Sequence, residues 1–195
     1  MFEELDNFLR VLKAASKYQM AIVINTLTEQ VTSSRLKDKV IHQPLMYHDP
    51  LRVFATAKHL AIDRLSLIAR EATLSVDIHS NITRSVEAST LSALSLWELE
   101  ETRRERRQWL TLRCWVSALS GGTVYDNPNV LLTCPLHDNK VALAKVLKRI
   151  KDFPCPKTIR ETDFNSELKC ERCGVAFYAF FNRICEDYEA KFSRF

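Results

Sequence analysis

Apolar residues recur at helical spacing along most of the chain. Between residues 3 and 31 they form two runs with a break near residues 16–18, which predicts two consecutive helices. Further along, Asp49 is followed directly by Pro50. This pair is typical of a helix start, because the acid caps the first turn and proline fits its first position. A second pair of helices is therefore expected over residues 50–72.

Polar connectors are expected at residues 33–50 and 75–86, where apolar residues follow no clear period. From 87 to 119 the helical period returns and predicts one long helix. Its expected buried positions are Leu91, Leu94, Trp97, Leu110 and Trp115. Two amphipathic helices are predicted over 139–153 and 173–192. The last of them should bury Phe177, Phe180, Phe181 and Ile184. The pattern therefore predicts a mostly all-α protein.

The composition agrees with a folded helical protein. Hydrophobic residues make up 46% and charged residues 27% of the chain, which is ordinary for a globular protein. Three glycines in 195 residues leave little material for hairpin turns or phosphate-binding loops. The formal net charge of +4 is well short of what binding several phosphates requires, so it does not predict a nucleic-acid partner.

The chain also carries no signal for a membrane or for export. No apolar run approaches the ~18 residues that span a bilayer, and the start Met-Phe-Glu-Glu is too acidic for a secretory signal. The protein is therefore expected inside the cell, in the cytoplasm or the nucleus. The connector near residue 80 suggests two modules, residues 1–80 and residues 81–195.

Several motifs follow one another along the chain. The first is LKAASKYQM followed by AIVINTL, and the second is DPLRVFATAKHLAIDRLSLIAREATLSVDI. After them come CPLH, PCPKT and CERC, and then the last amphipathic segment. In this order the motifs resemble the C-terminal portion of BTB/POZ domain proteins from basidiomycete fungi, and the resemblance covers nearly the whole chain.

The resemblance implies a helical remnant of a BTB fold, then a helical extension with a small module like a zinc ribbon or knuckle. Residues 1–80 would hold the closing BTB helices and the start of the extension, and residues 81–195 the Cys-rich module. In this family the Ala-x-Lys-Tyr-x-Met turn joins the closing helices, so Tyr18 and Met20 are expected in the core. The resemblance leaves open whether Met1 is the natural start.

The part of a BTB fold that builds its sheet has no counterpart in the chain. One face of the first helix would therefore lack its cover, and must repack on the extension, bind a partner or stay exposed. We expect this face to bind a protein partner, and self-association is one form of that binding. The face consists of Leu5, Phe8, Leu9 and Leu12.

Two close pairs of residues have the spacing of zinc ligands. Each pair is separated by two residues, so one tight turn directs both side chains at one ion. Three thiolates and one imidazole favour a closed, structural zinc site. The four ligands are Cys134, His137, Cys170 and Cys173. Cys155 is either a substitute ligand or a packed thiol. The alternative is that all are reduced, partly buried cysteines, as Cys114 and Cys185 are expected to be.

The charged run ELEETRRERR, residues 98–107, has two interpretations. Glu100 and Glu101 stand four and three residues before Arg104, which is typical of a solvated helix face. A zinc-dependent nucleic-acid-binding or transcriptional regulator would instead need the arginines to share a face with the zinc module. Those arginines are Arg103, Arg104, Arg106 and Arg107.

The sequence predicts a non-enzymatic protein–protein interaction module. Nothing in it resembles a nucleophile elbow, a phosphate loop or a pair of catalytic carboxylates, so no catalytic residue and no small-molecule substrate are expected. Histidines are expected at the surface or in helix packing, and they are His42, His48, His59 and His79. A third alternative is a truncated product without a function of its own.

Overall fold

A computed structural model describes residues 2–33, 35–37, 40–42, 44–83, 85–119, 139–162 and 171–192. These residues are mostly helical, as the apolar pattern predicts. The chain divides into two compact units, Met1–Leu99 and Glu100–Arg194. The sequence suggests a boundary between residues 80 and 81, and this position lies inside the first unit. The two modules, residues 1–80 and 81–195, remain a prediction.

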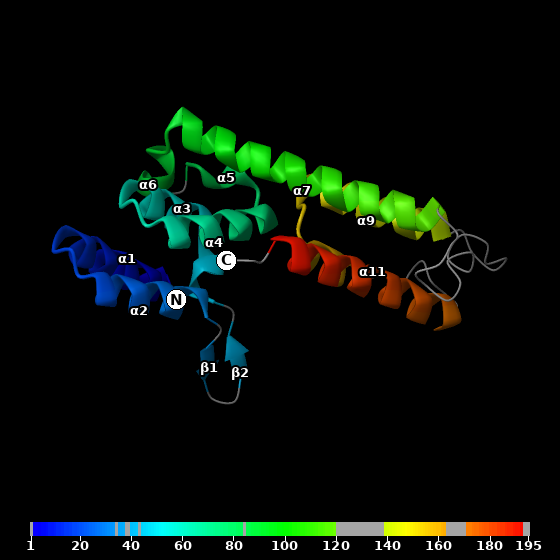
Figure 1. The fold of residues 1–195 in the computed structure, drawn as a ribbon, viewed down its shortest axis with the longest axis horizontal. Helices are drawn as coiled ribbons and strands as arrows, with labels where there is room; N and C mark the ends of the chain where they lie inside the picture. Colours follow the sequence, from blue (N-terminus) through cyan, green and yellow to red (C-terminus); the bar gives the residue numbers. More distant parts are fainter. Residues whose placement is uncertain are drawn as a thin grey trace. The chain divides into compact units, whose positions relative to one another are not determined.

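The first unit opens with an antiparallel helical hairpin (Figure 1). Helix α1 covers Phe2–Lys17 and α2 covers Ala21–Thr32, so the predicted break between two helices is confirmed. Gln19 lies in the turn with φ 54°, in the left-handed region that reverses the chain sharply. The amide of Met20 closes the turn by donating to the carbonyl of Ala15 at 2.9 Å.

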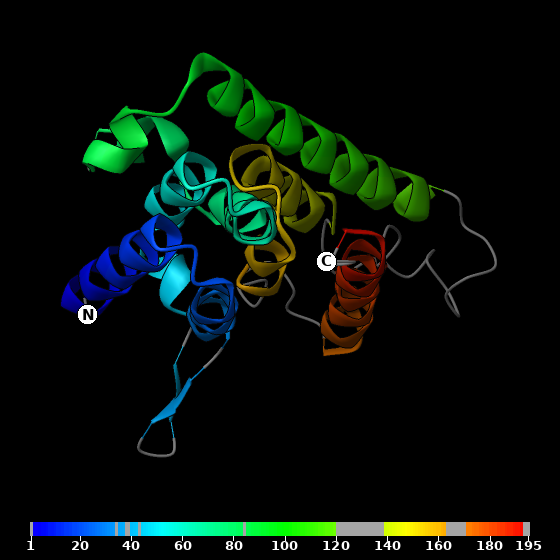
Figure 2. The same ribbon diagram turned by 60° about the vertical axis from the view of Figure 1, so that its left-hand side comes forward.

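The first predicted connector is not entirely irregular. It contains two short antiparallel strands, β1 (Arg35–Lys37) and β2 (Val40–His42), with Leu36 opposite Ile41. A 3₁₀ helix, η1, follows at Leu45–His48. Its apolar residues Leu45 and Met46 are buried in the core of the unit, so this part of the connector is structural. Both ribbon views show the strands projecting from the helices of their unit (Figures 1 and 2).

The second helical pair begins where Asp49 and Pro50 predict it. Helix α3 covers Pro50–His59, and Asp49 Oδ1 accepts from the amide of Arg52 at 3.1 Å. Helix α4 covers Asp63–Ala72 and packs on α3. The second connector contains more structure than expected, because it includes η2 (Thr73–Ser75) and α5 (Ile78–Asn81), and α6 (Val86–Ser89) starts at its end. Helix α6 packs on α3, and its Glu87 also meets Lys13 of α1.

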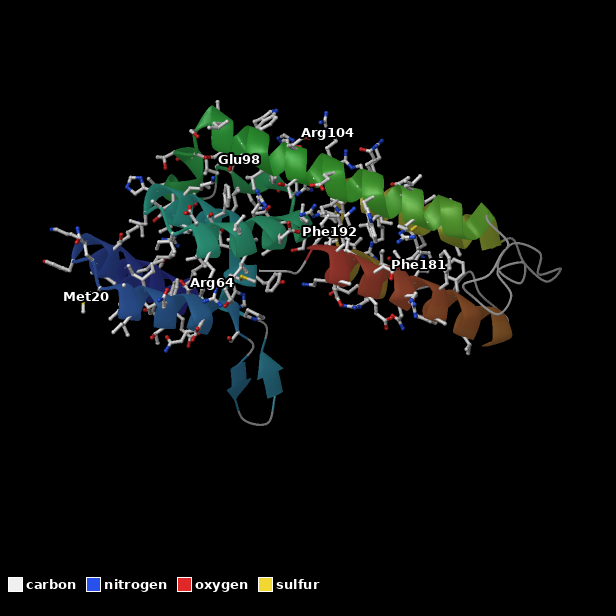
Figure 3. The ribbon with its side chains drawn as sticks, viewed as in Figure 1. Met20, Arg64, Glu98, Arg104, Phe181 and Phe192 are labelled. Atoms are coloured by element: carbon white, nitrogen blue, oxygen red, sulfur yellow. The ribbon has the colours of Figure 1, made fainter. Side chains whose placement is uncertain are left out.

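The second unit is built from four helices in the part that the structure describes. They are α7 (Ala93–Leu119), which starts in the first unit, α9 (Asn139–Asp152), α10 (Pro156–Arg160) and α11 (Glu171–Phe192). The predictions for α9 and α11 are confirmed. All four residues predicted on the buried face of α11 are buried, and Phe177 and Phe180 each meet Phe181 edge to face. Figure 3 shows Phe181 and Phe192 on the inner side of α11.

Helix α7 begins at Ala93 and not at the predicted residue 87. It buries the predicted face only in part, since Leu110 is buried as predicted and Leu91, before the helix, is partly buried. Leu99 lies in the core of the first unit, and Leu110 and Cys114 lie in the core of the second. Leu94 and Trp97 were expected to be buried but are exposed, and Trp97 retains 61% of its surface. The reason is geometric, since residues 97 and 99 lie about 200° apart around a helix, so the face with Leu99 turns Trp97 outward. Trp115 lies outside the residues whose side chains are described.

Candidate functional site

The face expected to bind a partner is covered by the chain itself. Leu5, Phe8, Leu9 and Leu12 are all buried, in one cluster with residues of α3 and α4 such as Phe54 and Leu65. Of the three outcomes considered for this face, the structure shows that it packs on other helices of the same chain. These side chains are core residues and present no free surface.

An apolar surface lies instead at the turn between α1 and α2, which we call the hairpin tip and define as Tyr18, Met20 and Ile22. Their exposed fractions are 69%, 49% and 83%. The prediction that Tyr18 and Met20 lie in the core is therefore wrong, because the turn at Gln19 carries both beyond the packed part of α1. Met20 is labelled at the end of the hairpin in Figure 3.

The tip continues along the outer face of α1 and is bordered by positive charge. Val11 is half exposed, and Ala14 and Tyr18 follow it at helical spacing on the exposed side. The ammonium group of Lys17 lies 5.8 Å from the centre of the Tyr18 ring, a cation–π distance. The tip therefore combines exposed apolar side chains with a neighbouring cation.

The first unit also contains a cavity of about 380 Å³, half open to solvent, between α1, α3 and α6. Ala55, Leu60 and Val86 form its apolar wall. The remaining lining residues carry polar groups and are Lys13, Thr56, His59, Glu87 and Thr90. A volume in this range suits a small ligand, and a mostly apolar wall with a few polar groups is typical of binding pockets.

One lining residue, Thr56, holds a buried hydroxyl without a hydrogen-bond partner among the described residues. The hydroxyls of Thr26, Thr28 and Thr32 on α2 each donate to the carbonyl four residues earlier. Thr56, in the middle of α3, makes no such bond. A buried hydroxyl without a partner lowers the stability of the fold by about 1–3 kcal/mol. The first unit therefore carries this cost at Thr56.

A chain of ion pairs borders the cavity. Lys13 Nζ lies 2.8 Å from Glu87 Oε1, and Arg52 Nε lies 3.0 Å from Glu87 Oε2. Arg52 also pairs with Asp6. Lys13 and Glu87 stand 74 residues apart in the sequence, and no local pattern relates them. Only the packing of α1, α3 and α6 brings these charges together.

The pKa of Glu87 reflects this arrangement. Partial burial by itself raises the pKa of the carboxyl, but hydrogen bonds from Lys13 and Arg52 favour the charged form more strongly, and the pKa falls to about 2. Glu87 is therefore ionised at every pH at which the protein is expected to work. One carboxylate thus holds two cations from two helices.

Acidification should weaken the first unit through Glu87. Its pKa is lowered by folding, so its contribution is present above the unfolded pKa, near 4.5, and is lost as the pH falls toward 2. We expect Glu87→Gln to cost about 1 kcal/mol at pH 7, because Lys13 is partly exposed and solvent screens the pair. The difference from wild type should vanish near pH 2. Urea denaturation across this range tests it, with Glu29→Gln as the control, and a constant difference at all pH values would contradict it.

The cysteines fall into two groups. Cys114, Cys155 and Cys185 are buried, unpaired thiols in the second unit. Burial raises the pKa of Cys114 to about 12 and that of Cys185 to about 11, so both stay protonated, which confirms them as packed thiols. Cys134, His137 and Cys170 lie outside the described residues. Cys173 is in the first turn of α11, and its side chain is not described.

The position of Cys155 bears on its role as a substitute ligand. Cys155 Sγ shares a hydrogen bond with Thr158 Oγ1 at 3.2 Å, and Cys185 Sγ donates to the carbonyl of neighbouring Pro156 at 3.7 Å. Cys155 therefore lies beside Cys185, which is twelve residues, or about 18 Å, along α11 from Cys173. Zinc ligands lie within about 2.3 Å of one ion, so this geometry favours the packed thiol over a ligand shared with Cys173. No cluster of three or more metal-binding side chains occurs among the described residues.

The arginine run is divided between the core and the surface. Arg103 is buried and donates to the carbonyl of Asp152 at 2.6 Å, which joins α7 to the end of α9. Arg106 is buried, pairs with Glu105 and stacks 3.6 Å from the centre of the Phe192 ring. Arg104 points to solvent, as Figure 3 shows. It pairs with Glu101 on its own helix at 2.6 Å. The interpretation as a solvated face therefore holds for Arg104 and is wrong for Arg103 and Arg106.

Comparison with protein-family models, with curated proteins and with solved structures finds no match. Among the described residues, no helix combines the length and the apolar character that crossing a membrane would require. The functional proposal therefore depends on the chain's own residues and their geometry.

Proposed function

We propose that the protein is a non-enzymatic protein–protein interaction module, related to the BTB/POZ proteins of basidiomycete fungi and held in its second half by a structural zinc ion. The observation that carries the proposal is the hairpin tip, where Tyr18 and Ile22 retain most of their surface in water. Exposed aromatic and aliphatic side chains gathered at one place are typical of binding surfaces.

The chemistry of the tip indicates the kind of partner. Its apolar residues would enter a hydrophobic groove, and Lys17 beside Tyr18 would meet an acidic group on the rim. A second copy of the chain is one such partner, since Glu3 and Glu4 are exposed at the start of α1. The residues that the sequence predicted to bind a partner play no part in this surface, because they are buried; they are Leu5, Phe8, Leu9 and Leu12.

The relation to BTB/POZ proteins has support from element boundaries. The chain reverses at residues 18–20, inside the motif that joins the closing BTB helices, and α3 begins at Pro50, inside the motif that opens the extension. Zinc is proposed from the spacing of Cys134, His137, Cys170 and Cys173.

The alternative of a nucleic-acid-binding regulator gains no support from the arginine run. Phosphate binding needs cations on a free surface. Arg103 and Arg106 are used within the fold, and Arg104 is paired with a carboxylate on its own helix. We therefore do not propose it.

Site-specific photo-crosslinking tests the proposal. A benzophenone amino acid at position 22 should form covalent adducts with a protein partner or with a second copy of the chain, because this position retains 83% of its surface. Mass spectrometry of the adducts should map them to a defined segment. The additional substitution Tyr18→Ser should reduce their yield, since it removes the neighbouring aromatic ring.

The matched control is the same crosslinker at position 141, where Val141 on α9 is also exposed and apolar. Adducts that form at position 22 and not at position 141 support the proposal. Equal yields at both positions, or no effect of Tyr18→Ser, would overturn it, because the tip would then behave as ordinary surface.

A further inference from the structure

Helix α7 exposes large apolar side chains along one side. Leu94, Trp97 and Leu112 each retain more than half of their surface. Since an α-helix advances about 100° per residue, they lie on the side opposite the buried Leu99 and Leu110. All belong to one continuous helix, so the helix itself fixes how they lie relative to one another. We call this side the outer stripe and define it as Leu94, Trp97, Glu101, Arg104, Gln108 and Leu112.

The outer stripe has the spacing of a helix that pairs with another helix. Its residues follow one another at intervals of three and four positions, as the contact positions of a coiled coil do. The apolar pattern of the sequence predicts Leu94 and Trp97 to be buried, and no described part of this chain covers them. A partner helix would cover them, and tryptophan is among the residues that contribute most to the binding energy of interfaces.

The order of the side chains identifies the partner helix. Apolar residues stand at both ends of the stripe, and Glu101 and Arg104 stand at its middle, where they pair at 2.6 Å. When a second α7 runs antiparallel to the first, Glu101 of each copy comes opposite Arg104 of the other. The same register brings Trp97 opposite Gln108 and Leu94 beside Leu112. The stripe is therefore complementary to itself.

Charge decides between the two directions in which the copies could run. In a parallel pair, Glu101 would face Glu101 and Arg104 would face Arg104, which is repulsive. In the antiparallel pair the four charges alternate in sign around the centre. Arg104 carries several N–H donors, so it can bind the carboxylates of both copies. Its side chain is 74% exposed and points to solvent in Figure 3, so a second copy can reach it.

One flank of the antiparallel pair brings like charges near each other. Glu98 of one copy comes near Glu105 of the other. Each of these carboxylates is already paired with a cation of its own chain, Glu98 with Lys58 at 2.6 Å and Glu105 with Arg106 at 2.8 Å. These cations offset the repulsion on this flank.

We propose that the protein forms an antiparallel homodimer through the outer stripe of α7, with a two-fold axis between Glu101 and Arg104. A two-fold interface requires one self-complementary patch, and this stripe is such a patch. The stripe is about 27 Å long, so the interface is small and we expect a dissociation constant of about 10 µM. The dimer does not depend on the hairpin tip, because none of the tip residues belongs to α7.

Analytical ultracentrifugation of the full-length chain provides the first test. Wild type should change from monomer to dimer between about 1 and 100 µM. Trp97→Ser should weaken the dimer about tenfold or more, because it removes the largest apolar side chain of the stripe. Tyr18→Ser at the hairpin tip should leave the dimer unchanged, which separates this dimer from any binding at the tip.

Charge reversal at the axis tests the register. Glu101→Arg alone and Arg104→Glu alone should each weaken the dimer about tenfold or more, because four like charges then meet at the axis. An equimolar mixture of the two variants should dimerise as wild type does, since each arginine then faces a glutamate of the other variant. Lys148→Glu on the exposed side of α9 changes the charge by as much as Arg104→Glu, and as the control it should have no effect.

Photo-crosslinking tests the direction of the two helices. A benzophenone amino acid at position 94 should link to residues near position 112 of a second copy if the copies run antiparallel, and near position 94 if they run parallel. A mixture of isotope-labelled and unlabelled chains identifies the links between copies by mass spectrometry.

A dimer that the mixture of variants restores, and that links position 94 to the region of position 112, supports the proposal. Four results would each overturn it. They are a wild type that is monomeric at about 100 µM, single charge reversals that dimerise like wild type, a mixture that stays monomeric, and links from position 94 to position 94.

Discussion

Leu12→Ala should destabilise the first unit by about 3 kcal/mol, although sequence analysis places Leu12 on a partner-binding face. Leu12 is fully buried and belongs to the cluster that joins α1 to α3 and α4. Its truncation would leave a cavity that the surrounding helices fill only partly. Urea denaturation, with hydrogen exchange of α1 amides to follow this unit separately, measures the loss.

The adjacent residue provides a matched control. Val11 is half exposed on the outer face of the same helix, so Val11→Ala should change the stability by less than about 0.5 kcal/mol. The prediction is contradicted if Leu12→Ala lowers the free energy of unfolding by less than about 1 kcal/mol and also abolishes binding of a partner. That result would show that this face of α1 binds a protein partner.

Loss of either half of the proposed zinc site, Cys134 with His137 or Cys170 with Cys173, should leave the protein without metal. We expect about one zinc ion per chain in the purified protein and close to none after Cys134→Ser or Cys170→Ser, since three remaining ligands hold zinc far more weakly than a closed tetrahedron. Helical circular dichroism should fall with the metal, because binding free energy at such a site is folding free energy. Metal analysis by mass spectrometry, before and after chelation, provides the measurement.

Cys114→Ala is the control for this experiment. Cys114 is buried in the core of the second unit, and its pKa of about 12 keeps the thiol protonated and unsuited to metal binding. This variant should retain its zinc even though it loses some packing. Wild-type protein without metal and with Cys134, Cys170 and Cys173 all reactive would rule out the zinc site.

The candidate sites show where sequence reasoning stops. The hairpin tip has a local signal, since Tyr18, Met20 and Ile22 cluster around a predicted helix break, but whether a cluster is covered depends on the rest of the fold. The cavity has no such signal. Thr56 and Glu87 stand 31 positions apart on helices whose packing no local pattern specifies. Its unpaired hydroxyl and its ion pairs are visible only in three dimensions.

By itself, the sequence determined the helical class of the protein, the bounds of α1, α2, α9 and α11 to within a few residues, and the start of α3. These follow from local physics, namely the 3.6-residue period of apolar positions and the cap that Asp49 and Pro50 provide. The tertiary structure decided which helix faces are covered. Leu12 on α1 became core, and Tyr18 in the turn after this helix became surface. Arg106 was buried because its guanidinium stacks on Phe192 while Glu105 balances its charge. A side chain is buried only when another surface packs against it, and that surface comes from residues far away in the sequence.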